Sequence, residues 1–264
     1  MMDLKLSGKT ALVLGASRGL GLASAIELGR EGANVMIASS NGGHHAHALA
    51  QLREAGVTNA HAITVDVRRP DDASHALADT VAQFGSLDIL VNNAGGPPFG
   101  SFDTFDDAAW QEAFDLSFLS IARFTRLALP HLRRSGEGRV INIVSFSVRH
   151  AMQGSILSTS MRLGVVGLAK LLSREANGNG ITVNNVAPGL ILTDRIRESS
   201  LKQKLADGRS EQQGLAELAA EVPLRRLGRP EELGALVAFL ASPRASYING
   251  ATIQVDGGLG SGIL

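Results

Sequence analysis

Residues 11–41 read ALVLGASRGLGLASAIELGREGANVMIASSN and set the architecture of the chain. An apolar run leads into a turn with Gly15, Gly19 and Gly21, and a helix is expected to begin near Leu20. Glycine permits positive φ and lets the backbone approach a pyrophosphate, which the free N–H groups of the helix N-terminus then attract. The G-x-x-x-G-x-G spacing predicts a dinucleotide site, and the alternative is a tight turn that binds nothing.

Apolar runs of strand length recur along the rest of the chain, and helix-like segments separate most of them. Buried strands that alternate with helices are typical of a parallel sheet covered on both faces. We therefore predict an α/β fold over residues 1–264, a single-domain Rossmann-type doubly wound parallel sheet with helices on both faces. Its strands, about seven, are expected at residues 11–14, 35–38, 62–65, 89–91, 140–144, 182–186 and 252–255.

Three longer segments complete the predicted organisation. Helices at residues 108–134 and 156–177 are apolar on nearly every side, so we expect them to pack against other subunits. The segment at about 194–222 is charged and polar, and Gly189 and Pro223 flank it. It is predicted to be a helical excursion that acts as a mobile substrate lid, without forming a second domain.

The composition excludes several classes of function. The 264 residues carry 25 basic and 25 acidic side chains and no cysteine, which leaves no charge footprint for nucleic acid and no disulfide. No uninterrupted apolar stretch of about 18 residues is present to span a bilayer, and the first residues are expected to form a strand rather than a signal peptide. The HHAH run at residues 44–47 lacks further ligands for a metal site. We expect a cytoplasmic protein without membrane or nucleic-acid partners.

The end of the second predicted strand selects the cofactor. NAD sites place a carboxylate there for the adenosine 2′-hydroxyl, but this chain has Ser39, Ser40 and Asn41. Arg18 in the glycine turn can pair with a 2′-phosphate, so we predict NADP(H), unless Arg18 is only a solvated turn residue. Asp66, at the end of the third strand, is expected to contact adenine or to cap the following helix.

Further motifs follow in order: NNAG at residues 92–95, Ser145 after the fifth strand, APG at 187–189 with Thr193, PLRRLGRPEE from Pro223, and YINGATIQVDGG near the end. With the glycine turn and Asp66, they resemble the short-chain dehydrogenase/reductase family, including its 3-oxoacyl-carrier-protein reductases, over nearly the whole chain. The resemblance implies an oxidoreductase in which NNAG walls the cofactor and APG with Thr193 holds the nicotinamide carboxamide. It also implies an assembly built on the two apolar helices, a homotetramer or homodimer. Cofactor contacts are thereby predicted at Gly15, Ser17, Arg18, Gly19, Leu20, Gly21, Ser39, Ser40, Asn41, Asp66, Val67, Asn93, Ala94, Gly95, Arg162, Pro188, Gly189 and Thr193.

The resemblance also implies a catalytic group of asparagine, serine, tyrosine and lysine, from which this chain departs. Aligning GLAK at residues 167–170 with the family's helix places Ser158 on the tyrosine and Arg162 on the lysine. Ser145 is retained 13 residues before Ser158, and Ser117 occupies the asparagine position. The only tyrosine, Tyr247, precedes the last strand, so the phenol has not moved to a nearby position.

These substitutions weaken acid catalysis. A serine hydroxyl is a far weaker acid than tyrosine, whose pKa is about 10, and losing a positioned general acid costs about 10²- to 10⁴-fold. Arg162 keeps a cation beside the cofactor ribose but cannot readily relay a proton. His150, in the loop after Ser145, is the best local candidate for the missing proton donor, and otherwise an exposed loop histidine. Its neighbour Arg149 is expected to bind an anionic substrate group or to be solvated.

Two functions are consistent with these observations. The first is an NADP(H)-dependent reductase of a small carbonyl or enone substrate, with protonation by Ser145, His150 or water. An activated double bond tolerates the missing tyrosine better, because the resulting carbanion or enolate takes a proton from solvent. The second is a catalytically silent NADP-binding protein that acts as a redox sensor or as a partner subunit.

Overall fold

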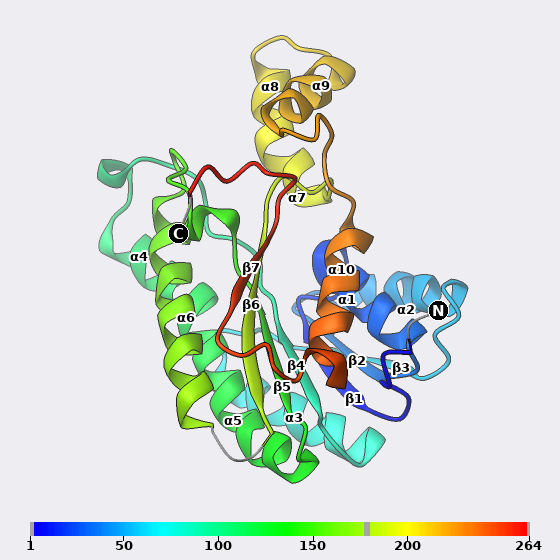
Figure 1. Cartoon of the computed structure of the whole chain (residues 1–264). Coiled ribbons are helices and arrows are strands. Elements are labelled where there is room, and N and C mark those ends of the chain that lie inside the picture. Colours follow the sequence, from blue (N-terminus) through cyan, green and yellow to red (C-terminus); the bar gives the residue numbers. More distant parts are fainter. Residues whose placement is uncertain (1–2, 177–179, 263–264) are drawn as a thin grey trace.

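The computed structural model, which describes residues 3–176 and 180–262, has one parallel sheet in the order β3-β2-β1-β4-β5-β6-β7 (Figure 1). This is the predicted Rossmann-type doubly wound sheet. The order reverses between β1 and β4, which places a crevice at the carboxyl ends of these strands. The strands are β1 Thr10–Leu14, β2 Asn34–Ser39, β3 Ala60–Thr64, β4 Ile89–Asn92, β5 Arg139–Ile143, β6 Thr182–Pro188 and β7 Thr252–Val255.

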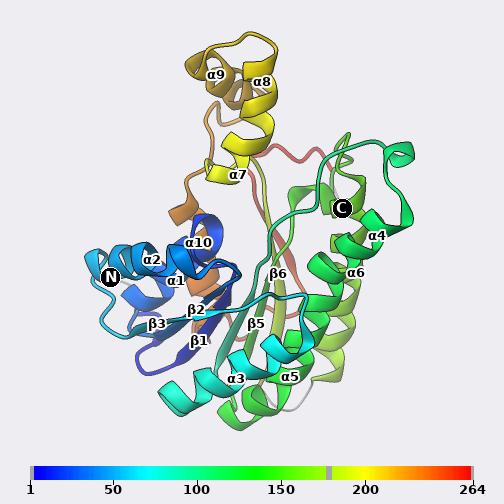
Figure 2. The same cartoon turned by 180° about the vertical axis from the view of Figure 1, so that it is seen from behind.

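Helices cover both faces of the sheet, as Figures 1 and 2 show from opposite sides. Successive strand residues point to opposite faces, so Val13 of β1 packs on one face while Leu12 and Leu14 pack on the other. The first face is covered by α1 Gly19–Arg30, α2 His45–Glu54 and α10 Pro230–Ala241. The second is covered by α3 Pro70–Phe84, α5 Ser120–Ser135 and α6 Ile156–Glu175.

The long helix expected at residues 108–134 is not a regular α-helix throughout. It consists of α4 Asp107–Phe114 and α5, joined by a π-helical turn at Asp115–Leu119 that contains Ser117. A π-helical turn inserts one extra residue and rotates the side chains that follow, which periodicity in the sequence does not reveal. The other long helix, α6, ends at Glu175, and the expected end at residue 177 lies outside the described residues.

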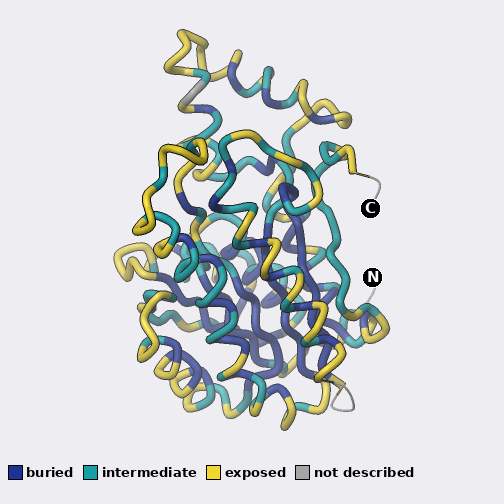
Figure 3. The backbone as a smooth tube through the Cα atoms, turned by 90° about the vertical axis from the view of Figure 1, so that its left-hand side faces the viewer, coloured by how far each residue is buried: buried dark blue, intermediate teal, exposed yellow. Residues whose placement is uncertain are grey.

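The charged segment after β6 forms the predicted helical excursion. It comprises α7 Asp194–Ile196, a π-helical turn at Arg197–Leu201, α8 Lys202–Ala206 and α9 Glu211–Glu221. It projects beyond the carboxyl ends of the strands (Figures 1 and 2), and Figure 3 shows how much of it is exposed beside the buried sheet. A small apolar cluster of its own holds it together, namely Leu190, Leu201, Leu218 and Val222.

Helix α6 carries two exposed leucines. Leu163 is 47% exposed and Leu171 is 62% exposed, although the opposite side of the helix packs on β6. By length and composition alone α6 would also pass as a membrane span, a test that core helices of globular domains pass as well. Apolar surface of this kind is typical of a helix that packs against another subunit.

Candidate active site

A cleft of about 460 Å³ opens at the carboxyl ends of the strands, where the strand order reverses. Its walls are the glycine turn, the ends of β2, β3 and β5, the loop after β4, the start of α6 and the first part of the excursion. Residues predicted from the sequence, drawn from seven separate segments, meet here. Those that line the cleft are Gly15, Ser17, Arg18, Gly19, Leu20, Ser39, Ser40, Asp66, Val67, Asn93, Ala94, Gly95, Ser145, Ser158, Arg162, Pro188, Gly189 and Thr193.

The glycine turn has the geometry that a pyrophosphate requires. Gly15 and Gly19 have φ values of 58° and 59°, and Asn93 Nδ2 donates a hydrogen bond of 3.1 Å to the Gly15 carbonyl. A Cβ atom on Gly21 would lie 2.3 Å from the Gly15 carbonyl oxygen, so Gly21 supports the turn from within α1 rather than lining the cleft. The first turn of α1 has neither a side-chain cap nor an acidic residue, which leaves its N–H groups for an anion.

The end of β2 carries hydroxyl and imidazole groups instead of a carboxylate. The Ser39 hydroxyl lies 2.9 Å from Nε2 of His45, the first residue of α2, and burial lowers the pKa of His45. Asn41 lies outside the cleft. Its side chain caps the short 3-10 helix Gly42–His44 by accepting a hydrogen bond from the Gly43 N–H. Across residues 3–176 and 180–262, no group of three or more metal-ligating side chains is found.

Arg18 reaches over the nucleotide end of the cleft and is held there by the excursion. Its Nη1 donates hydrogen bonds to Oε1 of Glu198 at 2.9 Å and to Oδ2 of Asp194 at 3.3 Å. These two carboxylates raise the pKa of Arg18. A guanidinium at this place, with no acid at the end of β2, fits a nucleotide that carries a 2′-phosphate. The residues present therefore fit NADP(H).

Asp66 lines the cleft just beyond the carboxyl end of β3. Both oxygens of its carboxylate accept hydrogen bonds from Arg68, whose guanidinium lowers the pKa of Asp66. The hydrogen bonds that the Asp66 side chain makes go to Arg68 and not to the first turn of α3, whose N-cap is Arg69. The capping role offered as the alternative for Asp66 is therefore wrong.

Ser145, Ser158 and Arg162 form the opposite, reaction end of the cleft. Ser158 and Arg162 lie one helical turn apart on α6, and Arg162 Nε donates a 3.1 Å hydrogen bond to the Ser158 hydroxyl. Arg162 Nη1 donates to the carbonyls of Ile143 and Val144, both at 2.9 Å. The side chain is only 8% exposed, and burial, with a smaller contribution from the charge of Arg195, lowers the pKa of Arg162 to about 10.

Two residues predicted for catalysis lie elsewhere. Ser117 is buried in the π-helical turn, and its hydroxyl has no hydrogen-bond partner within the described part of the chain. His150 stacks on Phe146 at 5.8 Å between ring centroids, and its Nδ1 lies 3.1 Å from the Ser261 hydroxyl. It lines an adjoining hollow beneath the excursion, not the cleft itself.

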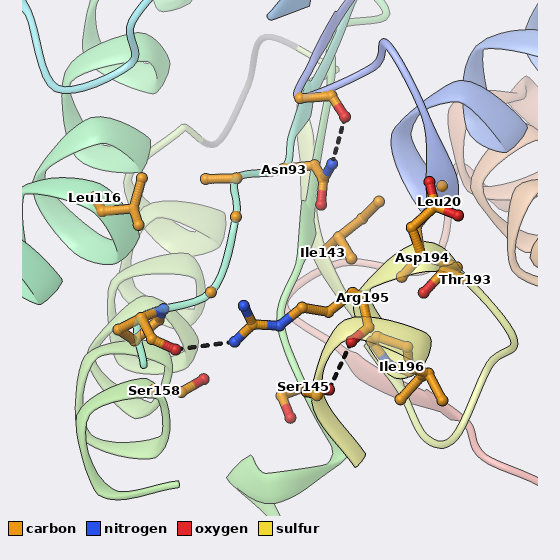
Figure 4. A pocket seen from close by; sticks show the side chains of 18 of the residues that line it. Leu20, Asn93, Leu116, Ile143, Ser145, Ser158, Thr193, Asp194, Arg195 and Ile196 are labelled. Carbon is orange, nitrogen blue, oxygen red and sulfur yellow. Dashed lines mark hydrogen bonds between the residues drawn. The ribbon is translucent and has the colours of Figure 1, made fainter. Parts of the chain in front are cut away.

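The cleft also contains residues that the sequence did not predict as site residues, and Arg195 is the one among them whose charge faces the reaction end. Arg195, two positions after Thr193, extends from α7 across the reaction end (Figure 4). Its Nη2 donates a 2.9 Å hydrogen bond to the Pro97 carbonyl, and its guanidinium carbon lies 5.5 Å from the centre of the Phe99 ring. The signal that could have identified it is its position two residues after Thr193, but the charged composition of residues 194–222 led us to place Arg195 in the exposed excursion.

A family model described as enoyl-(acyl carrier protein) reductase matches residues 15–260. The chain belongs to the short-chain dehydrogenase/reductase family. Among curated relatives of this dehydrogenase/reductase, the 3-oxoacyl-(acyl-carrier-protein) reductase FabG of Staphylococcus epidermidis is 34% identical over 251 residues, 95% of this chain and 98% of that protein. FabG of Vibrio cholerae is 35% identical over 256 residues, which cover 97% of this chain and 99% of its own.

Solved structures agree with this assignment. A variant of actinorhodin polyketide ketoreductase, solved with NADPH, superposes with a TM-score of 0.89 at 32% identity, covering 99% of this chain and 100% of that one. L-sorbose reductase from Gluconobacter frateurii, complexed with NADPH and L-sorbose, gives a TM-score of 0.94 at 30% identity with the same coverage. The predicted family and fold are thus confirmed, and the dehydrogenase/reductase fold is present over its full length.

Proposed function

We propose that the chain is an NADP(H)-dependent reductase of a carbonyl group or an activated carbon–carbon double bond. The observation that carries the proposal is a cleft in which a glycine turn and Arg18 lie at one end and two serine hydroxyls lie at the other. The relatives solved with NADPH support the choice of cofactor. When bound, NADPH supplies the hydride.

The hydroxyl of Ser158 is oriented by Arg162. Because Nε of Arg162 donates to the Ser158 oxygen, the hydroxyl hydrogen of Ser158 is left to point elsewhere, including into the cleft. A substrate oxygen that gains negative charge would accept hydrogen bonds from Ser158 and Ser145, which lowers the free energy of the transition state. Serine remains a poor proton source, so we assign the final protonation to water.

Because the serines stabilise negative charge and water supplies the proton, the site favours substrates whose reduction depends little on a strong general acid. In an activated double bond the negative charge spreads over a conjugated system, and solvent can protonate the resulting enolate. A simple ketone develops a localised alkoxide and loses more by the absence of tyrosine. We therefore rank enones above simple ketones. His150 could supply the proton only after rearrangement of the loop that holds it beside Ser261.

The exposed leucines of α6 support a homotetramer or homodimer as the working form, and the protein is assigned to the cytoplasm. Size-exclusion chromatography with light scattering measures the mass directly. A monomer at micromolar concentration would contradict the assembly without affecting the proposed reaction.

A second function, a silent NADP-binding protein, is favoured by the replacements at Ser117, Ser158 and Arg162. An NADPH-oxidation screen over ketones, 3-oxoacyl thioesters and enones separates the two functions, with Ser145→Ala and His150→Ala measured on each active substrate. We expect turnover of at least one class, a loss of about 10²-fold in Ser145→Ala, and little effect of His150→Ala. Tight NADPH binding without turnover of any class would reject the reductase and leave the silent protein.

A further inference from the structure

Seven charged side chains line the cleft, and they are paired unevenly. The three carboxylates are all engaged by arginines from the nucleotide end: Asp194 and Glu198 by Arg18, and Asp66 by Arg68. The two remaining arginines, Arg162 and Arg195, have no carboxylate partner among the described residues. The reaction end therefore holds two cations without a counter-ion from the protein.

Arg195 is directed toward the reaction end and away from the cofactor's phosphate site. In Figure 4 its side chain extends from α7 toward Ser158, leaving Thr193 and Leu20 behind it. Its hydrogen bond to the Pro97 carbonyl and its stacking on Phe99 fix the guanidinium across the cleft. A pyrophosphate bound at the glycine turn would lie at the other end, beside Arg18, so Arg195 is available to a different anion.

The burial of Arg162 raises the free energy of the uncompensated positive charge at the reaction end. Arg162 is buried, its partners are two carbonyls and one hydroxyl, and it is close enough to Arg195 for the two charges to repel each other. Like charges in a partly desolvated cleft raise the free energy of the free protein, and an anion placed between or beside them relieves the repulsion. A planar carboxylate matches the fork of a guanidinium, which binds it bidentately.

We propose that Arg195 binds a carboxylate of the substrate, with the charge of Arg162 adding to the attraction, so that the preferred substrate is an oxo acid or its unsaturated counterpart. This inference rests on the proposed reductase function and goes further by naming the substrate class. It makes Arg195 a specificity-determining residue. The two serine hydroxyls remain free for the reacting oxygen of the same molecule.

The test compares the binding of an oxo acid with the binding of its uncharged methyl ester. Binding of 3-oxobutanoate and of its methyl ester is measured by calorimetry, with and without NADPH, on the wild type, Arg195→Met, Arg195→Lys and the control Arg197→Met. Arg197 lies on the same segment but pairs with Glu211 outside the cleft. We expect the acid to bind about 10- to 100-fold more tightly than the ester in the wild type and in Arg197→Met.

In Arg195→Met most of the preference for the acid over the ester should be lost, and the remainder is the share that the charge of Arg162 contributes. Arg195→Lys should keep part of the preference, because lysine retains the charge but not the fork. Equal binding of acid and ester by the wild type, or an unchanged preference in Arg195→Met, would overturn the inference. Tighter binding of dihydroxyacetone phosphate than of 3-oxobutanoate would overturn the choice of carboxylate over phosphate.

These outcomes are separate from those that test the proposed reaction. A protein that prefers the acid through Arg195 but never oxidises NADPH would keep the carboxylate site at Arg195 and reject the reductase. A protein that reduces ester and acid equally well, with Arg195→Met unaffected, would keep the reductase and reject the inference. Kinetics with both substrates on the same variants, read as kcat/KM, distinguish the two results.

Discussion

The two ends of the cleft differ in how closely they follow the family pattern. The nucleotide end keeps the glycines, the uncapped start of α1 and the Asn93 contact to Gly15. The reaction end keeps Ser145 but carries Ser158 and Arg162 where tyrosine and lysine are implied. Nucleotide binding depends mainly on where the backbone can pass, whereas the reaction depends on the chemistry of a few side chains. The side chains of the reaction end can therefore change while nucleotide binding is retained.

Restoring the family's acid should give the largest effect. The double variant Ser158→Tyr with Arg162→Lys returns a phenol beside a cation, and we expect kcat/KM for ketone reduction to rise by about 10²- to 10⁴-fold. The matched control, Ser158→Phe with Arg162→Lys, has the same bulk without the hydroxyl and should show no gain. Equal rates in the two variants would mean that the reaction end differs by more than its acid.

A side chain at Gly21 should disrupt the glycine turn and weaken nucleotide binding. Gly21→Ala places a Cβ 2.3 Å from the Gly15 carbonyl oxygen, so the backbone of the turn must move. We expect NADPH binding to weaken by more than about 10²-fold, with a lower Tm, in fluorescence titration and thermal unfolding. Gly167→Ala, where a Cβ meets nothing within 4 Å, is the control and should keep both values. Undiminished NADPH binding in Gly21→Ala would contradict the placement of the pyrophosphate.

Substitution of Arg18 tests whether the nucleotide end selects a nucleotide that carries the 2′-phosphate. Arg18→Met should weaken NADPH binding about tenfold and leave NADH binding unchanged, because only NADPH carries the extra phosphate. Glu198→Gln removes one of the two carboxylates that engage Arg18, and should strengthen NADPH binding a few-fold. A similar loss for both nucleotides in Arg18→Met would show that Arg18 serves the pyrophosphate instead.

The smallest effect is expected at the start of α10, the helix that packs against α1. Hydrogen bonds from Arg226 and from the Arg229 N–H lower the pKa of Glu232 from 4.5 to about 2. A depressed carboxyl pKa stabilises the fold above pH 4.5, and this contribution is lost as the pH falls toward 2. The pair is partly exposed, so we expect less than about 1 kcal/mol. Chemical unfolding of Glu232→Gln should show a smaller loss of stability than the wild type over this pH interval.

Much of the nucleotide end could be predicted because its signals are local. The turn at Gly15, the missing acid at Ser39 and the position of Asn93 each depend on a few neighbouring residues. The positions of Arg195 and Ser117 could not be predicted in this way. Arg195 belongs to a segment whose charge is typical of an exposed surface, and a π-helical turn rotates the residues around Ser117 away from the expected face.

Local sequence signals were sufficient to predict the parallel sheet, the family and NADP(H) as the cofactor. These follow from residue types at short spacings, because glycine conformations and the alternation of strands and helices are properties of neighbouring residues. The arrangement in space was needed to show that His150 lies beside the cleft, that Arg18 is held by Asp194 and Glu198, and that Arg195 and Arg162 meet at the reaction end. Contacts between segments far apart in the chain depend on the packing of the whole fold, which no local pattern contains.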